Sequence, residues 1–126
     1  MKRILNIAAV FVLALSGKTL SAQIDVNNTG IVYINSTTDT FSVSGIFRNT
    51  GSAALTNNGI IQLTRDLVND QASMATGSGT LILNGSTTQI VSGSQKFSTN
   101  NLITSNASGI TLNNDLSVSA VHTYAS

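Results

Sequence analysis

A glycine followed by a short run of apolar or β-branched residues recurs along this chain, and an asparagine closes most of the runs. Degenerate repeats of short strands and polar turns are typical of proteins in which successive coils stack and each coil buries its apolar side against the next. The repeat therefore predicts an all-β chain folded as a parallel β-helix, or β-solenoid, of short strands. Its copies occupy residues 30–35, 45–49, 59–63, 79–84 and 109–113.

The spacing of the strands leaves a second architecture open. Expected strands begin near residues 30, 41, 55–60, 80, 89, 102, 110 and 116, at uneven intervals. A coil of two or three short strands fits this spacing, and so does an antiparallel β-sandwich, in which Asn84-Gly85 would form a hairpin turn. Two features favour the solenoid: the runs resemble one another, and Asn recurs at corners, where stacked amides can bond between coils.

Two segments need separate treatment. Phe41, Val43 and Phe47 follow a period of two and are expected on one strand face, directed into the core. Residues 65–76 contain good helix formers, but their apolar stripe is thin and no clear cap frames them. We interpret residues 65–76 as strand and loop, with a short helix as the alternative.

The first residues have the layout of an export signal. Lys2 and Arg3 form a positive start, and residues 7–15 form an apolar run too short to span a bilayer comfortably. Small residues follow, and cleavage is expected after Ala22. The chain is thus divided into a helical signal peptide at residues 1–22 and a solenoid domain at residues 23–126; a retained membrane anchor is the alternative.

Charge and composition exclude several classes of function. Removal of residues 1–22 leaves three basic and five acidic residues, a net charge of −2 in place of the +1 of the whole chain. No basic patch remains to neutralise phosphates, so nucleic-acid binding is disfavoured. The chain has no Cys, so disulfides and thiolate metal sites are impossible, and stability has to come from strand stacking and burial.

Residues 77–112 resemble a repeat of secreted surface proteins from the Bacteroidetes group. In that repeat a strand ending in Asn-Gly is followed by Gln and Gly, an aromatic residue, an Asn-Leu strand and a glycine-led strand. The end of the signal, Ser21-Ala22-Gln23, also resembles the usual form in that group. The matching residues are Gly79, Asn84, Gly85, Gln89, Gly93, Phe97, Asn101, Leu102, Asn106, Gly109 and Leu112.

The resemblance implies a β-helix-like stalk or adhesin module at the cell surface. Many such proteins end in a C-terminal sorting domain of the type IX secretion route. This chain stops at Ser126, directly after an expected strand. We therefore expect a fragment of a longer array, or a chain that relies on a partner for attachment, with a periplasmic location if the sorting domain is missing.

A search for chemistry finds no catalytic, cofactor-binding or metal-binding residues. His122 is expected to be an exposed tail residue, since a triad histidine needs a packed shell around it. Asp66 and Asp70 would be neighbours if their segment were helical, but solvated loop carboxylates are the favoured interpretation. The remaining acids, Asp25, Asp39 and Asp115, are too scattered for a calcium loop.

The aromatic residues also have two interpretations. Tyr33, Phe41, Phe47 and Phe97 would suit a platform that stacks on sugars. Each lies in an apolar strand, however, so stacking within the core is favoured for all four.

The sequence thus predicts a non-enzymatic, secreted or cell-surface module with a structural or adhesive role. A face rich in Ser, Thr and Asn would bind glycans, or other surface proteins, through many weak hydrogen bonds. Two alternatives stay open: a fragment of a β-helix enzyme that degrades polysaccharides, and a fibre subunit that associates end to end, because the coil ends carry few charges and no proline.

Overall fold

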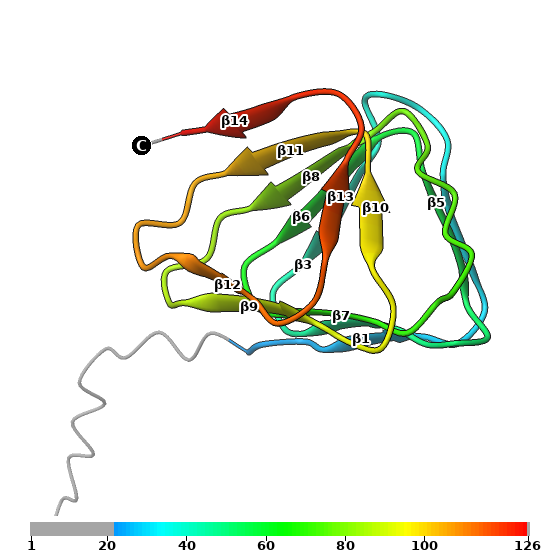
Figure 1. The fold of residues 1–126 in the computed structure, drawn as a ribbon, viewed down its shortest axis with the longest axis horizontal. Coiled ribbons are helices and arrows are strands. Elements are labelled where there is room, and N and C mark those ends of the chain that lie inside the picture. Colours follow the sequence, from blue (N-terminus) through cyan, green and yellow to red (C-terminus); the bar gives the residue numbers. More distant parts are fainter. Residues whose placement is uncertain (1–21, 126) are drawn as a thin grey trace, which may run out of the picture.

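The computed structural model describes residues 22–125, and within this range every regular element is a β-strand. The strands are three or four residues long and stack in parallel as a β-solenoid of about five coils (Figure 1). The β-solenoid prediction is therefore confirmed. The expected signal peptide lies almost entirely outside the described residues.

Two five-stranded sheets run the whole length of the stack. The first sheet has the order β1-β4-β7-β9-β12 and the second has the order β14-β11-β8-β6-β3. All neighbours are parallel, and in the second sheet paired residues are 20 or 21 positions apart, which is one coil. The first sheet comprises Val26–Asn28, Phe47–Asn49, Leu67–Asn69, Gln89–Ser92 and Ile110–Leu112; the second, in chain order, comprises Thr40–Val43, Ile60–Leu63, Thr80–Leu83, Asn101–Thr104 and His122–Tyr124.

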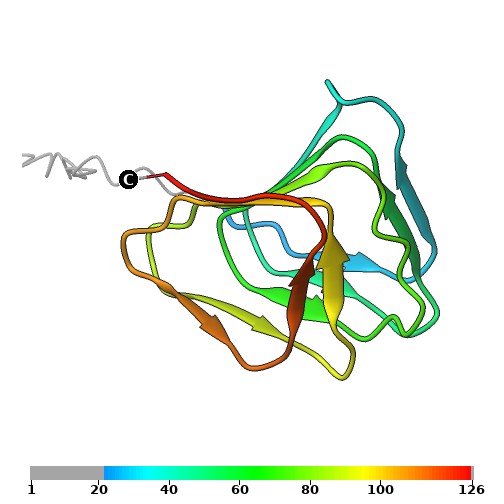
Figure 2. The ribbon, with the colours of Figure 1, turned by 45° about the horizontal axis from the view of Figure 1, so that its top comes forward.

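The third side of the coil is discontinuous. β2 (Ile31–Ile34) pairs with β5 (Ala54–Asn57), and β10 (Phe97–Thr99) pairs with β13 (Leu116–Val118), but the two pairs do not join. In the coil between them, residues 70–79 form a loop in place of a strand. Figure 2 shows the two pairs standing apart, β2 and β5 in cyan and green, β10 and β13 in yellow and red.

Columns of apolar side chains fill the space between the sheets. In the second sheet Ile61, Leu81 and Leu102 occupy one register position in three successive coils, and all three are buried. Leu63 and Leu83 form the neighbouring column. Burying each such side chain contributes about 1.5–3 kcal/mol, so this interior supplies the stability that the absence of disulfides requires.

Three local expectations are settled by the strand order. Residues 65–76 contain β7 and a loop, which confirms the strand-and-loop interpretation over the helix. Asn84-Gly85 lies in a corner between β8 and β9, which belong to different sheets, so the hairpin alternative is wrong. Phe41 and Phe47 are separated by a corner at Gly45, and lie on strands of different sheets rather than on one strand.

No helix within residues 22–125 has the length and apolar character needed to cross a membrane.

Candidate functional site

The aspartates serve the corners of the coils. Asp25 Oδ1 accepts from the backbone N–H of Ile46 at 2.7 Å, and Asp39 Oδ2 accepts from that of Ser36 at 3.1 Å. Among residues 22–125 no group of three or more His, Cys, Asp or Glu side chains is placed to hold a metal ion.

Asp66 and Asp70 flank β7 and are not helix neighbours. Asp66 Oδ1 accepts from the N–H of Ile90 at 2.9 Å, and Asp70 Oδ1 accepts from both the N–H and the Oγ of Ser94, at 2.8 and 2.9 Å. Hydrogen bonds from Ser94 hold the pKa of Asp70 below its usual value, and the backbone N–H contributes more to this lowering than the side chain does. Both carboxylates thus tie one coil to the next.

His122 is part of the fold rather than a loose tail. It is exposed, as expected, but it lies in β14, where its ring contacts that of Tyr124 at a tilt of 41°, with the ring centroids 4.2 Å apart. Its Nε2 is 3.2 Å from the hydroxyl of Thr104 in the preceding coil. Sequence reasoning missed this strand because His, Thr and Tyr do not form an apolar run.

The four aromatic residues do not share a surface. Phe47 and Phe97 are buried, and Phe41 contacts Phe47 edge to face with ring centroids 5.7 Å apart. Tyr33 instead points outward and is 59% exposed, so the expectation of core stacking is wrong for this residue. With its ring alone on the surface, no aromatic sugar platform forms from this set.

Buried amides form a ladder along the end of the first sheet. Asn28 Nδ2 donates to Asn49 Oδ1 at 2.9 Å, and Asn49 Nδ2 donates to Asn69 Oδ1 at 2.8 Å. Asn69 Nδ2 then donates to the carbonyl of Lys96 at 2.8 Å. The prediction that corner asparagines bond between coils is confirmed.

Two glutamines complete this internal polar network, and no sequence pattern singled out their role. Gln71 Oε1, from the loop after β7, accepts from Asn49 Nδ2 at 2.7 Å. Gln89 Nε2 donates to the carbonyls of Leu63 and Arg65, and its Oε1 accepts from the N–H of Gly85 at 2.8 Å. Buried Asn and Gln side chains therefore hold neighbouring coils together through hydrogen bonds.

The outward face of the second sheet carries polar side chains that make no hydrogen bond between coils within residues 22–125. Its central strands present Thr80 and Ile82 on β8 and Asn101 and Ile103 on β11, all half-buried. Their alternation with buried leucines directs them away from the core. Among the described residues, the Thr80 and Asn101 side chains make no hydrogen bond. The face, defined here as the outward second-sheet face, consists of Thr40, Ser42, Ile60, Gln62, Thr80, Ile82, Asn101, Ile103 and Thr123.

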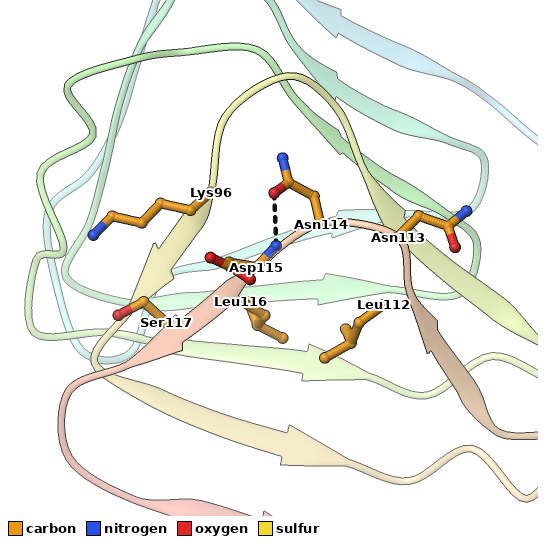
Figure 3. A pocket seen from close by; sticks show the side chains of 7 residues that line it. All are labelled: Lys96, Leu112, Asn113, Asn114, Asp115, Leu116 and Ser117. Carbon is orange, nitrogen blue, oxygen red and sulfur yellow. Dashed lines mark hydrogen bonds between the residues drawn. The ribbon is translucent and has the colours of Figure 1, made fainter.

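Two hollows lie at the last coil. The larger has a volume of about 660 Å³ and is mainly apolar, with Leu83, Leu102, Leu112, His122 and Tyr124 among its lining residues. The other, of about 510 Å³, lies over the turn between β12 and β13. Figure 3 shows Leu112 and Leu116 pointing toward one another in it, while Lys96 extends away. The smaller hollow is lined by Lys96, Asp115 and Ser117, but within the described residues no hydrogen bond joins these three side chains.

Comparison of the chain with protein-family models, with curated proteins and with solved structures finds no match. The fold and the chemistry of its surfaces therefore carry the functional argument alone.

Proposed function

We propose that this chain is a non-enzymatic structural or adhesive module of a secreted or cell-surface protein, similar to adhesin repeats of the Bacteroidetes group. The observation that carries the proposal is that some polar side chains bond between coils while others, on the outward second-sheet face, do not. Corner amides and carboxylates bond between coils, whereas Thr80 and Asn101 on the outward second-sheet face have no such partner.

The same face favours carbohydrate as the ligand. Thr and Asn offer donors and acceptors to sugar hydroxyls, and Ile82 and Ile103, adjacent in register, offer apolar surface to the C–H side of a sugar ring. Each contact is weak, so useful affinity requires a repeating ligand that meets several coils at once. A surface polysaccharide has this property.

A glycan array probed with the purified protein tests the proposal. We expect binding to polymeric glycans and little binding to single sugars. Thr80→Lys, at the centre of the face, should abolish the signal, whereas Thr111→Lys, on the outward side of β12 in the first sheet, should leave it unchanged. A blank array, or equal loss in both variants, would contradict glycan adhesion, and cleavage of a uronic-acid polymer would favour the enzyme alternative.

Export is part of the proposal and has its own test. Expressed in a bacterium with a general secretory route, the protein should be recovered outside the cytoplasm with Gln23 as its first residue. Mass spectrometry of the intact chain measures this directly. Recovery of the chain with residues 1–22 still attached in the membrane fraction would favour the retained anchor instead.

A further inference from the structure

In the described part of the chain, residues 22–125, the last coil leaves inward-facing side chains uncovered. In the first sheet Leu67 and Val91 are buried, but Leu112, at the same register position in the last coil, is 56% exposed. In the second sheet Leu83 is buried, whereas Tyr124, two coils further on in the same column, is 80% exposed. The hollow of about 660 Å³ lies over these residues.

Both ends of the two long sheets are edges in the described structure. β12 and β14 end the sheets at the last coil, and β1 and β3 end them at the first. Their sequences are ITL, HTY, VNN and TFSV, without the Lys, Glu or Pro that proteins commonly place on exposed edges to prevent pairing. Stacked-repeat proteins otherwise need polar terminal coils to stay soluble.

The occupant that fits the last coil has to offer parallel strands to both sheets at once. The first coil of the same chain offers β1 and β3 in the same order and direction as the coils that already stack inside the molecule. The third side does not need to match, because it is already interrupted between β5 and β10 without breaking the stack.

We propose that the last coil of one copy binds the first coil of a second copy, with β14 pairing with β3 and β12 with β1. Continuation of the internal register places His122 beside Phe41 of the second copy, Tyr124 beside Val43, and Leu112 beside Val26. Because the two surfaces are different, the contact does not close on itself and builds a linear, open-ended assembly. This assembly does not depend on glycan binding.

The backbone pattern identifies a substitution that blocks each end. Val26 N–H donates to the Ile46 carbonyl, and the Asn28 carbonyl accepts from Thr50, so the alternation of a parallel ladder directs the N–H of Asn27 to the open edge. Asn27→Pro removes that donor from the first coil and leaves the internal bonds in place. At the other end, Tyr124→Lys places a charge in the open column, and Ala72→Lys, at an exposed position in the loop of the middle coil, is the charge-matched control.

Sedimentation velocity over a concentration series tests the proposal, with circular dichroism to verify that each variant is folded. The mass of the wild-type protein and of Ala72→Lys should rise with concentration beyond that of a dimer. Asn27→Pro and Tyr124→Lys should each be monomeric alone and form one-to-one dimers when mixed, because one retains an intact last coil and the other an intact first coil.

Three results would overturn the proposal. A wild-type protein that stays monomeric at every concentration would show that the ends do not pair. Self-association of Asn27→Pro alone would indicate that two last coils meet instead. Binding of the apolar dye 1-anilinonaphthalene-8-sulfonate by a monomeric wild-type protein, abolished by Tyr124→Lys, would assign the hollow to a small ligand.

Discussion

Asn49 Nδ2 donates a hydrogen bond to Oδ1 of Asn69 at 2.8 Å, one coil further along the solenoid. Both residues are fully buried and are register partners in neighbouring strands of the first sheet. Because Asn28 donates to Asn49 in the same direction, Asn49 is both donor and acceptor, and these hydrogen bonds offset the cost of removing its amide from water.

Asn49→Ala is expected to destabilise the protein by about 2–4 kcal/mol, because it leaves partners on Asn28, Asn69 and Gln71 unsatisfied in the interior. Urea unfolding followed by circular dichroism measures the change. Asn35→Ala, at an exposed position without a side-chain hydrogen bond among the described residues, is the matched control and should lie within about 0.5 kcal/mol of wild type. Equal midpoints for the two variants would show that the ladder contributes little.

The ladder stops where Gly93 follows Asn69 in the next coil. Gly93 has a φ of 117°, and a Cβ there would lie 2.1 Å from the Asn69 carbonyl oxygen. Gly93→Ala should therefore lower the melting temperature severely or prevent folding, through both strain and a backbone clash. Gly109→Ala, with a φ of 88° and open space around the Cβ, isolates the strain and should cost only about 1–2 kcal/mol.

Gly30→Ala completes this series of glycine variants. A Cβ on Gly30 meets nothing within 4 Å, and its φ lies outside the left-handed region. Its stability should stay within about 0.5 kcal/mol of wild type. Thermal unfolding should therefore rank Gly93→Ala as the least stable, then Gly109→Ala, then Gly30→Ala. Any other order would contradict the assigned causes.

The sequence predicts the fold where local pattern and tertiary context agree. Expected strand starts near residues 30, 41, 80, 89, 110 and 116 lie within one residue of the observed ones, because each follows a glycine or polar turn. The corner between β3 and β4 was missed because residues 41–47 keep a period of two through Gly45. Gly45 forms a corner because the chain passes close to a segment that is distant in sequence. A Cβ added at this position would lie 2.5 Å from the Ile24 carbonyl carbon.

The surface was harder to predict than the core. Residues 31–34 are uniformly apolar, so no alternation indicated that Tyr33 points outward while Ile34 is buried. Gln71 and Gln89 bond to groups in neighbouring coils, so their roles depend on which residues lie above and below them. Composition does not contain that information. The outward second-sheet face follows from register, and register was not available from the sequence.

Adjacent residues of β8 provide a test of the inward and outward assignment. Leu81 is fully buried between Ile61 and Leu102, so Leu81→Ala should cost about 2–5 kcal/mol through lost burial and a residual cavity. Ile82→Ala, one position along and facing outward, removes a half-buried side chain and should cost about 1 kcal/mol. Chemical unfolding distinguishes the two, and a larger effect at Ile82 would reverse the assigned face of the strand.

Acid sensitivity should depend on the contact between Asp70 and Ser94. The pKa of Asp70 is lower in the folded chain than the value of about 3.9 expected when unfolded, because the N–H and Oγ of Ser94 donate to the carboxylate. The stabilisation is therefore fully present above about pH 4 and is lost as the pH falls through the folded pKa. Asp70→Asn should unfold at a lower temperature than wild type at pH 6 and show a smaller further decrease between pH 6 and pH 3.

Ser94→Ala distinguishes the two donors in this contact. It removes the Oγ bond and retains the backbone bond, which is the larger cause of the lowered pKa of Asp70, so its loss of melting temperature at pH 6 should be smaller than that of Asp70→Asn. Its pH dependence should lie between those of Asp70→Asn and wild type, because part of the downward pKa shift remains. Melting curves recorded at pH 6 and pH 3 for the three proteins measure both quantities. If Asp70→Asn and wild type lost equal melting temperature on acidification, the carboxylate would not be the group that links these two coils to pH.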